Sequence, residues 1–410
     1  MLVKPVGEHT FFSTEDPPPQ KVFFGVGTSK QLGGLASEYG KKVLLVSDPG
    51  VSAAGHSHSA KETMEKSGLE VFLFDQSIEN PTETSVQDCV QVAKEENIDV
   101  IVGLGGGSSM DTAKGCNFIL SNGGKMSDYW GVGKAKKAFL PFIAVPTTAG
   151  TGSECQSFAL ISNDESHKKM ACGDKKALPL VTILDPELTI SQPHSVSAST
   201  GVDALAHALE SAVTIKRNKK SFRHSQLAFN LIQENLPLVL KDPTNLEYRG
   251  KVLLGASHAG AAIEQSMLGA AHSMANPLTV SKGVVHGIAV SMALPEIIKF
   301  NASRRAETNF QYAEVARNSG IAEQGATDTH ATQLLLERVC LILSQSGIPE
   351  SIATFGFTQE DIPSLASDAS EQWTAQFNPV PVTRKDFEDL YFLILNKVPS
   401  KVAGGSKLSA

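Results

Sequence analysis

Residues 99–111 are Asp99-Val100-Ile101-Val102-Gly103-Leu104-Gly105-Gly106-Gly107-Ser108-Ser109-Met110-Asp111. The apolar run is typical of a buried strand, and the glycines after it allow a tight turn into a helix. Glycines let a backbone approach a phosphate, whose charge the amides and dipole of the helix N-terminus stabilise. We expect Ser108 and Asp111 to form a capping box. The stretch predicts a strand, a phosphate-binding turn and a helix, although a plain tight turn also needs glycine.

The same alternation continues on both sides of this stretch. Strand patterns lie at 43–46, 71–74, 100–102 and 142–145, and helical patterns lie at 58–67, 86–96 and 109–120. Strands that alternate with helices indicate an α/β fold, a parallel sheet covered on both faces. Long helical patterns follow at 200–214, 221–239, 248–268, 287–300 and 330–346. We therefore expect an α/β domain at 1–194 and an all-helical domain at 195–410.

Composition narrows the class of protein. The 410 residues are 41% hydrophobic and carry a formal net charge of -7. This negative charge does not indicate a protein that binds nucleic acid through excess basic residues. No apolar run reaches the ~18 residues of a membrane span, and residues 1–8 lack the apolar core of a signal peptide. The five cysteines show no close pairing, and the Ser-Lys-Leu string at 406–408 is not terminal. These features predict a cytoplasmic globular protein that binds neither nucleic acid nor membrane.

Two further segments extend the predicted ligand site. Asp48 follows the strand at 43–46, where its carboxylate could accept hydrogen bonds from a ribose. The loop Pro146–Glu154 follows the strand at 142–145 and offers threonine hydroxyls at the edge where open α/β sheets bind ligands. No Lys-Ser or Lys-Thr pair follows the glycines at 105–107, so the turn is not a nucleoside-triphosphate loop.

A second set of residues predicts a metal site in the helical half. Asp203 and His207 are four residues apart, so a helix places both side chains on one face. The same spacing also occurs in simple helix-surface contacts. What favours a metal is the second pair, His272 and His286, which lies in similar surroundings of small apolar residues.

The second pair requires a turn of the chain. On one continuous helix His272 and His286 would be about 21 Å apart, too far to share an ion. We expect Pro277 and Gly283 to break the helix, with His272 near the end of one helix and His286 at the start of the next. One carboxylate and three imidazoles suit Fe²⁺, Zn²⁺, Mn²⁺ or Co²⁺ about equally.

Together, these motifs resemble those of the iron-containing alcohol dehydrogenase family, whose fold is related to that of dehydroquinate synthase. The glycine-serine turn at 105–111, the threonine loop at 146–154, and the residues Asp203, His207, His272 and His286-Gly287 all match. The resemblance covers nearly the whole chain. It implies that the α/β domain at 1–194 is a dinucleotide-binding domain. It also implies an NAD-dependent alcohol dehydrogenase that interconverts an alcohol and an aldehyde or ketone. It also implies one divalent metal, usually Fe²⁺ with Zn²⁺ as the alternative, in a homodimer or larger homo-oligomer.

The resemblance also assigns roles to single residues. It implies that Asp48 binds the ribose and that further cofactor contacts come from Asn80, Gly106, Gly107, Ser108, Asp111, Thr147, Thr148, Thr151 and Lys169. It places the four metal ligands at Asp203, His207, His272 and His286. Many members carry a second histidine four residues after the third ligand, and this chain has Asn276 there. An amide can orient a substrate but carries no proton, so the proton route differs.

Two alternatives stay open at this point. A lyase related to dehydroquinate synthase would use the same fold, NAD and a metal. Such an enzyme needs several Lys and Arg side chains for a carboxylated, phosphorylated substrate, and the motif segments are poor in them. A non-catalytic binding protein would not need four intact ligand positions. The sequence favours the dehydrogenase, and it does not identify the alcohol or the physiological direction.

Overall fold

The computed structural model describes residues 6–10, 20–165 and 168–397. The expectations for residues 1–5 and for the tail after residue 397 lie outside these ranges. The chain packs as two compact units, Met1–Gln192 with Thr244–Ser257, and Pro193–Pro243 with His258–Ala410. No helix in the described ranges is long and apolar enough to cross a bilayer.

The first unit is built on a mostly parallel sheet. In the described residues seven strands form it, in the order β1-β2-β10-β7-β5-β3-β4, and only β1 runs antiparallel to its neighbour. The strands are β1 (Val6–Thr10), β2 (Lys21–Phe24), β3 (Lys42–Val46), β4 (Glu70–Phe74), β5 (Val100–Gly105), β7 (Phe142–Pro146) and β10 (Val181–Leu184). The predicted parallel sheet is confirmed.

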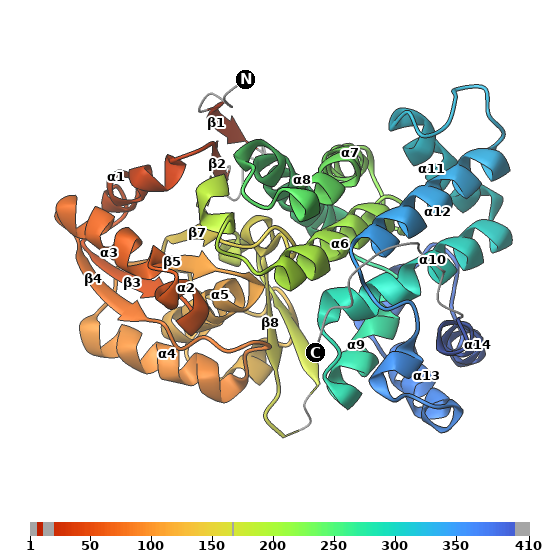
Figure 1. Ribbon diagram of the computed structural model, residues 1–410. Helices are drawn as coiled ribbons and strands as arrows, with labels where there is room; N and C mark the ends of the chain where they lie inside the picture. Colours follow the sequence, from red (N-terminus) through yellow and green to blue (C-terminus); the bar gives the residue numbers. More distant parts are fainter. Residues whose placement is uncertain (1–5, 11–19, 166–167, 398–410) are drawn as a thin grey trace. The chain divides into compact units, whose positions relative to one another are not determined.

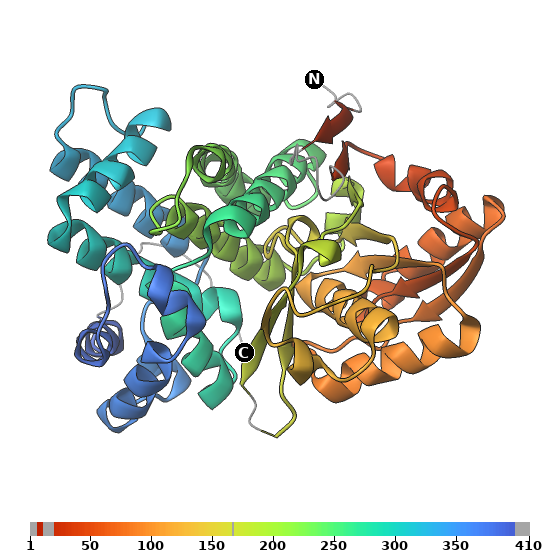
Figure 2. The same cartoon turned by 180° about the vertical axis from the view of Figure 1, so that it is seen from behind.

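Helices cover both faces of this sheet (Figure 1; Figure 2 gives the view from behind). On β3, Val43 and Leu45 pack into a core with α1 (Leu32–Ser37) and α3 (His56–Lys66). The alternate residues Leu44 and Val46 pack into a second core with α4 (Glu83–Glu96) and α5 (Gly107–Asn122). Because strand side chains alternate between faces, a strand of continuous apolar residues is buried on both.

A smaller sheet in the first unit was not predicted. It has the order β6-β9-β8, formed by β6 (Gly131–Val132), β9 (Lys169–Gly173) and β8 (Phe158–Ser162). β8 and β9 pair antiparallel, and β8 alternates between half-buried and buried residues. These strands are short and mix polar with apolar residues, so their pattern gives a weak signal.

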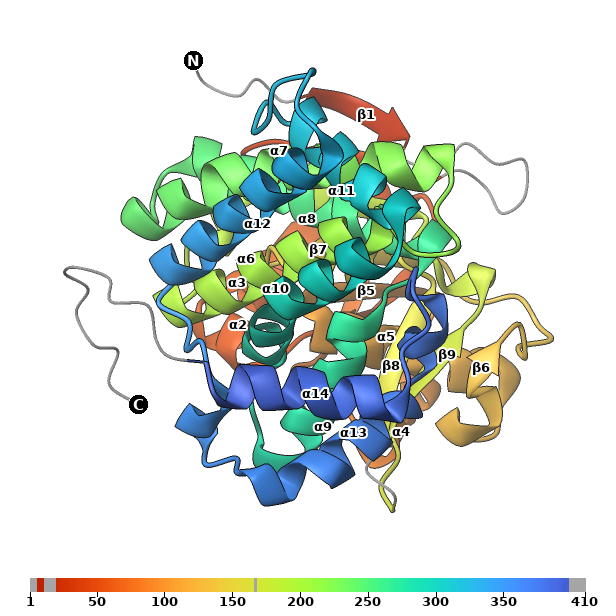
Figure 3. The same ribbon diagram turned by 90° about the vertical axis from the view of Figure 1, so that its right-hand side faces the viewer.

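The second unit is helical, as predicted (Figure 3). Its helices are α6 (His194–Ser211), α7 (Lys219–Lys241), α9 (Ala270–Lys282), α10 (His286–Arg304), α11 (Ala306–Asn318), α12 (Asp328–Gln345), α13 (Ile362–Ser370) and α14 (Arg384–Leu395). α6 packs against α7 and α10, and α10 also packs against α9. Two pairs of consecutive helices, α6 with α7 and α9 with α10, are therefore joined by the packing of α6 against α10.

Helix α8 (Leu246–Ser266) contributes to both units. Its first part belongs to the first unit, where the buried Ser257 hydroxyl donates to Glu154 Oε1 at 2.5 Å. Gly250 in the same part is packed so closely that an added Cβ would lie 3.1 Å from Pro186 Cγ and 3.4 Å from Phe24 Cζ. The first unit is therefore made from two separate stretches of chain.

Candidate active site

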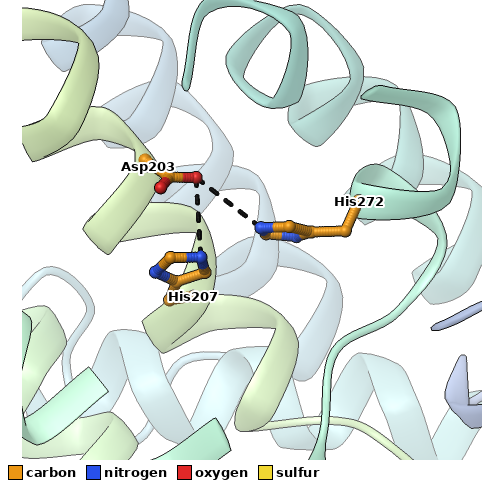
Figure 4. Close-up of side chains that lie close together, drawn as sticks. All are labelled: Asp203, His207 and His272. Carbon is orange, nitrogen blue, oxygen red and sulfur yellow. Dashed lines mark ion pairs between the residues drawn. The ribbon is translucent and has the colours of Figure 1, made fainter. Parts of the chain in front are cut away.

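Helix α6 carries the first two predicted metal ligands. Asp203 and His207 lie one turn apart on a helix that is buried along almost all of its length from Ser197 to Ser211. The distance from His207 Nε2 to Asp203 Oδ1 is 3.5 Å, and both side chains are nearly fully buried (Figure 4). A carboxylate and an imidazole thus share one face of a helix inside the second unit, as the spacing predicted.

His272 and His286 reach the same carboxylate from two other helices. His272 lies in the first turn of α9, with its Nε2 3.6 Å from Asp203 Oδ1. His286 is the first residue of α10, with its Nε2 3.9 Å from the same oxygen. The rings of His207 and His272 stack with centroids 4.8 Å apart. Three imidazoles therefore converge on one carboxylate oxygen.

The expected helix break was right at Gly283 and wrong at Pro277. Pro277 lies inside α9, so His272 is near the beginning of that helix and not near the end of one. The helix ends only at Lys282, where Gly283 takes the left-handed conformation with φ of 66°. A proline removes one hydrogen bond from a helix interior, yet α9 continues through Pro277, which is itself buried.

The ligand atoms have the spacing of a metal site. Two atoms that each lie about 2.1 Å from an ion, at the tetrahedral angle, are about 3.4 Å apart. The three distances from Asp203 Oδ1 to the imidazoles, 3.5, 3.6 and 3.9 Å, are close to that value. Among the described residues Asp203 Oδ1 and His272 Nε2 are buried and have no hydrogen-bond partner. Buried polar atoms without partners are costly, and a cation would satisfy both.

The electrostatics of the cluster agree with this interpretation. Burial alone would raise the pKa of the Asp203 carboxyl, but His207, then His272 and His286, outweigh it and hold the pKa well below its usual value. Burial alone would lower the pKa of His272, but Glu210 and Asp203 raise it to about 9. The surroundings thus favour an ionised carboxylate and a positive charge beside it, which a bound metal would supply.

The fourth ligand differs from the other three. Asp203, His207 and His272 are buried, and their ligand atoms all lie within 4.8 Å of one another. The His286 side chain is 29% exposed and has the longest distance to Asp203. His286 therefore lies at the exposed side of the cluster, and its role as the fourth ligand stays a prediction.

A glycine allows α10 to reach the site. Gly287 follows His286, and a Cβ added to it would lie only 2.1 Å from the backbone oxygen of Ser199 and 3.2 Å from Asp203 Cβ. The start of α10 therefore contacts the backbone of α6 directly. This close approach brings His286 within reach of Asp203.

Sequence reasoning missed Glu210. This residue lies on α6, three residues after His207, and its side chain is almost completely buried. His272 Nδ1 donates to Glu210 Oε2, and the backbone N–H of Ala271 donates to Glu210 Oε1 at 2.7 Å. The signal available in the sequence was a glutamate at helical spacing from two metal ligands in an otherwise apolar run.

Asn276 lies one helical turn after His272 on α9. Its Nδ2 donates to Gln372 Oε1 at 2.9 Å, and the Gln372 Nε2 donates to the backbone oxygen of Asp368 at 3.2 Å. The bond to Gln372 thus assigns the donor nitrogen of the Asn276 amide, and the other polar atom of the amide is an oxygen, which can only accept. The role of Asn276 in orienting the substrate stays a prediction.

Asp48, the glycine-serine turn and the threonine loop lie at the carboxyl edge of the main sheet. β5 lies between β3 and β7, so the segments that follow these strands are neighbours. Asp48 accepts from the Val51 N–H at 3.0 Å, as the N-cap of α2 (Pro49–Ala53), and from the Ser109 hydroxyl at 3.0 Å. The structure therefore joins Asp48 to the glycine-serine turn.

The glycines of that turn face the threonine loop. A Cβ added to Gly106 would lie 3.3 Å from Thr148, and one added to Gly107 would lie 2.7 Å from Thr151 Cγ2. The missing side chains therefore allow the two loops to approach each other. Gln192 Nε2 donates to the backbone oxygen of Thr147 at the start of the threonine loop.

The predicted capping box was wrong. The N-cap of α5 is Gly106, which has no side-chain cap, and Ser108 lies within the first turn. Asp111 is buried and accepts from the Ser153 hydroxyl at 3.0 Å. Burial raises the pKa of Asp111, although Lys114 opposes the shift. Asp111 thus connects α5 to the threonine loop, and its cofactor contact stays a prediction.

Asn80 and Lys169 come together from distant positions in the sequence. Lys169 Nζ lies 3.2 Å from Asn80 Oδ1, and Asn80 adopts a left-handed conformation with φ of 52°. A non-glycine residue in this conformation is uncommon and marks a turn or a functional position. Of the histidines without an assigned role, His258 pairs with His224, and His167 lies outside the described residues.

Comparisons with known proteins agree with this geometry. Residues 19–186 match the model of the iron-containing alcohol dehydrogenase family, and residues 197–394 match the model of its C-terminal part. The NAD-dependent methanol dehydrogenase of Bacillus methanolicus is 33% identical over 91% of this chain and 97% of its own. The 1,3-propanediol dehydrogenase of Citrobacter freundii is 30% identical over 91% of this chain and 96% of its own.

A solved structure gives the same result for the fold. The crystal structure of a 1,3-propanediol oxidoreductase superposes with a TM-score of 0.88 at 29% identity, over 91% of this chain and 97% of that one. The comparisons support the predicted dehydrogenase over the lyase alternative, and Asp203, His207 and His272 form its metal-binding site. The chain belongs to the iron-containing alcohol dehydrogenase family and is an NAD-dependent alcohol dehydrogenase.

Proposed function

We propose that this enzyme interconverts a small primary alcohol or diol and its aldehyde, with NAD as the hydride carrier and Fe²⁺ as the metal. The convergence of three imidazole Nε2 atoms on Asp203 Oδ1 carries this proposal. Relatives named for methanol and 1,3-propanediol support the substrate class. Zn²⁺ is the alternative metal, because the donor set accepts both ions.

Asp203, His207, His272 and His286 would hold the ion in this proposal. When bound, a divalent metal acts as a Lewis acid that stabilises the negative charge of the alcohol oxygen and polarises the carbonyl. Asp203 supplies the anionic ligand. His286 is the most exposed of the four side chains, so a substrate would approach the ion from its side.

The residues at the sheet edge would bind NAD. Asp48 would accept hydrogen bonds from the ribose and repel the 2′-phosphate of NADP. The amides from Gly106 to Ser108 would bind the pyrophosphate at the N-terminus of α5. The remaining proposed contacts are Asn80, Asp111, Thr147, Thr148, Thr151 and Lys169.

Asn276 would orient the alcohol without taking its proton. Its amide oxygen can accept a hydrogen bond from a hydroxyl, while Gln372 holds the amide nitrogen. An amide does not titrate in the working range, so the proton would leave through water or the cofactor ribose.

The proposal also includes the organisation of the enzyme. Residues 1–194 would form the cofactor domain and residues 195–410 the metal domain, and the enzyme would be a cytoplasmic homodimer or larger homo-oligomer. These statements follow the family resemblance. Light scattering coupled to size-exclusion chromatography measures the assembly.

The experiment that tests the function compares His272→Ala and His286→Ala with His224→Ala. His224 belongs to the same unit and pairs with His258, outside the metal cluster. We expect the first two variants to lose bound metal and activity while they keep NAD affinity, because the proposed cofactor residues lie in the other unit. The His224→Ala variant should retain all three properties. Normal turnover without bound metal in both ligand variants would refute the proposed mechanism.

A further inference from the structure

Glu210 connects two helices at the metal cluster. It lies on α6, two turns after Asp203, and both of its oxygens accept hydrogen bonds from the beginning of α9. Oε2 accepts from His272 Nδ1, and Oε1 accepts from the Ala271 N–H at 2.7 Å. Each carboxylate oxygen of Glu210 therefore accepts one hydrogen bond from α9.

The bond to Glu210 fixes the role of each nitrogen of His272. With Nδ1 as the donor, the lone pair available for a metal is on Nε2, which lies 3.6 Å from Asp203 Oδ1. Metal-ligating histidines commonly donate their other ring N–H to a carboxylate, which sets the tautomer and the ring orientation.

Glu210 also places a second carboxylate at the metal cluster, in addition to that of Asp203. Among the described residues, the ion pairs of Asp203 and Glu210 involve only histidines and no lysine or arginine. The two buried carboxylates thus supply two negative charges, which one divalent cation balances when the three imidazoles are neutral.

We propose that Glu210 is a positioning residue for the metal, which orients His272 Nε2 toward the ion and neutralises the ion's second charge. This inference rests on the metal-dependent function proposed above. It assigns a role in metal affinity to a residue that does not touch the metal.

A purely structural role is the competing explanation. The N-cap Gly269 provides no side-chain acceptor, so the first amides of α9 are satisfied from elsewhere in the chain. Asn378 Oδ1 accepts from the Ala270 N–H at 3.3 Å, as Glu210 accepts from Ala271. Both residues accept from the first amides of α9, but of the two Glu210 is the one that also accepts from the His272 side chain. Asn378 therefore offers a matched control.

The test uses the full-length protein and the variants Glu210→Gln, Glu210→Ala and Asn378→Ala. Zn²⁺ affinity is measured by competition with a chelator, the visible spectrum is recorded after Co²⁺ loading, and thermal unfolding is followed without metal. We expect about 10- to 100-fold weaker Zn²⁺ binding for Glu210→Ala, a smaller loss for the isosteric Glu210→Gln, and shifted Co²⁺ bands in both. Asn378→Ala should lower the unfolding temperature, keep the wild-type Co²⁺ spectrum and bind Zn²⁺ within about threefold of wild type.

The outcomes distinguish a failure of the metal-dependent function from a failure of the role proposed for Glu210. If wild-type protein bound neither Zn²⁺ nor Co²⁺, the metal-dependent function would fail. If wild type bound both and Glu210→Gln and Glu210→Ala bound them equally well with unchanged spectra, only the role of Glu210 would fail. If Asn378→Ala weakened Zn²⁺ binding as strongly as Glu210→Ala, the effect would come from the end of α9, and the positioning role would be overturned.

Discussion

Replacing Gly287 with alanine should separate α10 from α6 at the metal cluster. The added Cβ would lie 2.1 Å from the backbone oxygen of Ser199, far below a contact distance of about 3.5 Å. The obstacle is a helix backbone, which cannot rotate away as a side chain does. The start of α10 must therefore move by roughly 1 Å or more.

That movement is large compared with the geometry of the site. His286 Nε2 is 3.9 Å from Asp203 Oδ1. Two ligands bound at about 2.1 Å to one ion can be at most about 4.2 Å apart, so a further 1 Å removes His286 from the ion. Overpacking of this kind also costs about 1–3 kcal/mol of unfolding free energy. We expect at least about tenfold weaker Zn²⁺ binding and a lower unfolding temperature.

The matched control is Gly201→Ala on α6. Its Cβ would lie 2.3 Å from Leu236 Cδ1, the end of a flexible side chain that can move aside. Zn²⁺ per chain after gel filtration, chelator competition and thermal unfolding are measured for both variants. Gly201→Ala should retain its metal. If Gly287→Ala bound Zn²⁺ with wild-type affinity, the close approach of the two helices would not be what places His286.

Three further predictions concern the cofactor, the substrate and stability. Asp48→Asn keeps an oxygen that can cap α2 but removes the negative charge, so the ratio of kcat/KM for NAD to kcat/KM for NADP should fall. If the wild-type enzyme used NADP as efficiently as NAD, Asp48 would not bind the ribose as proposed. Asn276→Ala should lower kcat about tenfold and leave the metal content unchanged; loss of metal would instead make Asn276 part of the metal site. Burial alone would raise the pKa of the Asp386 carboxyl, but hydrogen bonds from Thr383 and then the charge of Arg304 hold this pKa below its usual value. The ionised carboxylate therefore stabilises the fold above about pH 4, and this stabilisation is lost as the pH falls through the depressed pKa. Asp386→Asn should therefore lower the unfolding temperature by about 2–4 °C at pH 7, with a gap that narrows toward acidic pH; a constant gap would show that the charge is not involved.

Much of the fold could be predicted because its core strands are continuously apolar. Residues 43–46 and 100–102 are buried on both faces, and this burial produces the pattern that identified them. The strand Phe158–Ser162 has only one buried face and ends near polar residues, so its pairing with Lys169–Gly173 depends on distant contacts. Local sequence does not report such contacts.

The metal site was predictable for a different reason. The spacing of Asp203 and His207 has a direct geometric meaning on a helix, and it needed no knowledge of tertiary structure. The position of His272 within α9 was mistaken because Pro277 normally ends a helix, and only packing explains why it does not do so here. The spacing of Glu210 from Asp203 and His207 was only a weak signal, since a glutamate in a helix is ordinary and its partners come from α9.

The two-part construction of the first unit limits how this protein can be divided or rearranged. A fragment that ended at Gln192 would lack Thr244–Ser257, and with it the hydroxyl that partners the buried Glu154 carboxyl. It would also uncover the surfaces of Phe24 and Pro186 that pack against Gly250. The first unit is thus made from two stretches that are separate in the sequence, so truncating the gene at one position cannot produce the complete unit. Exchange of cofactor modules between relatives would have to transfer both stretches together.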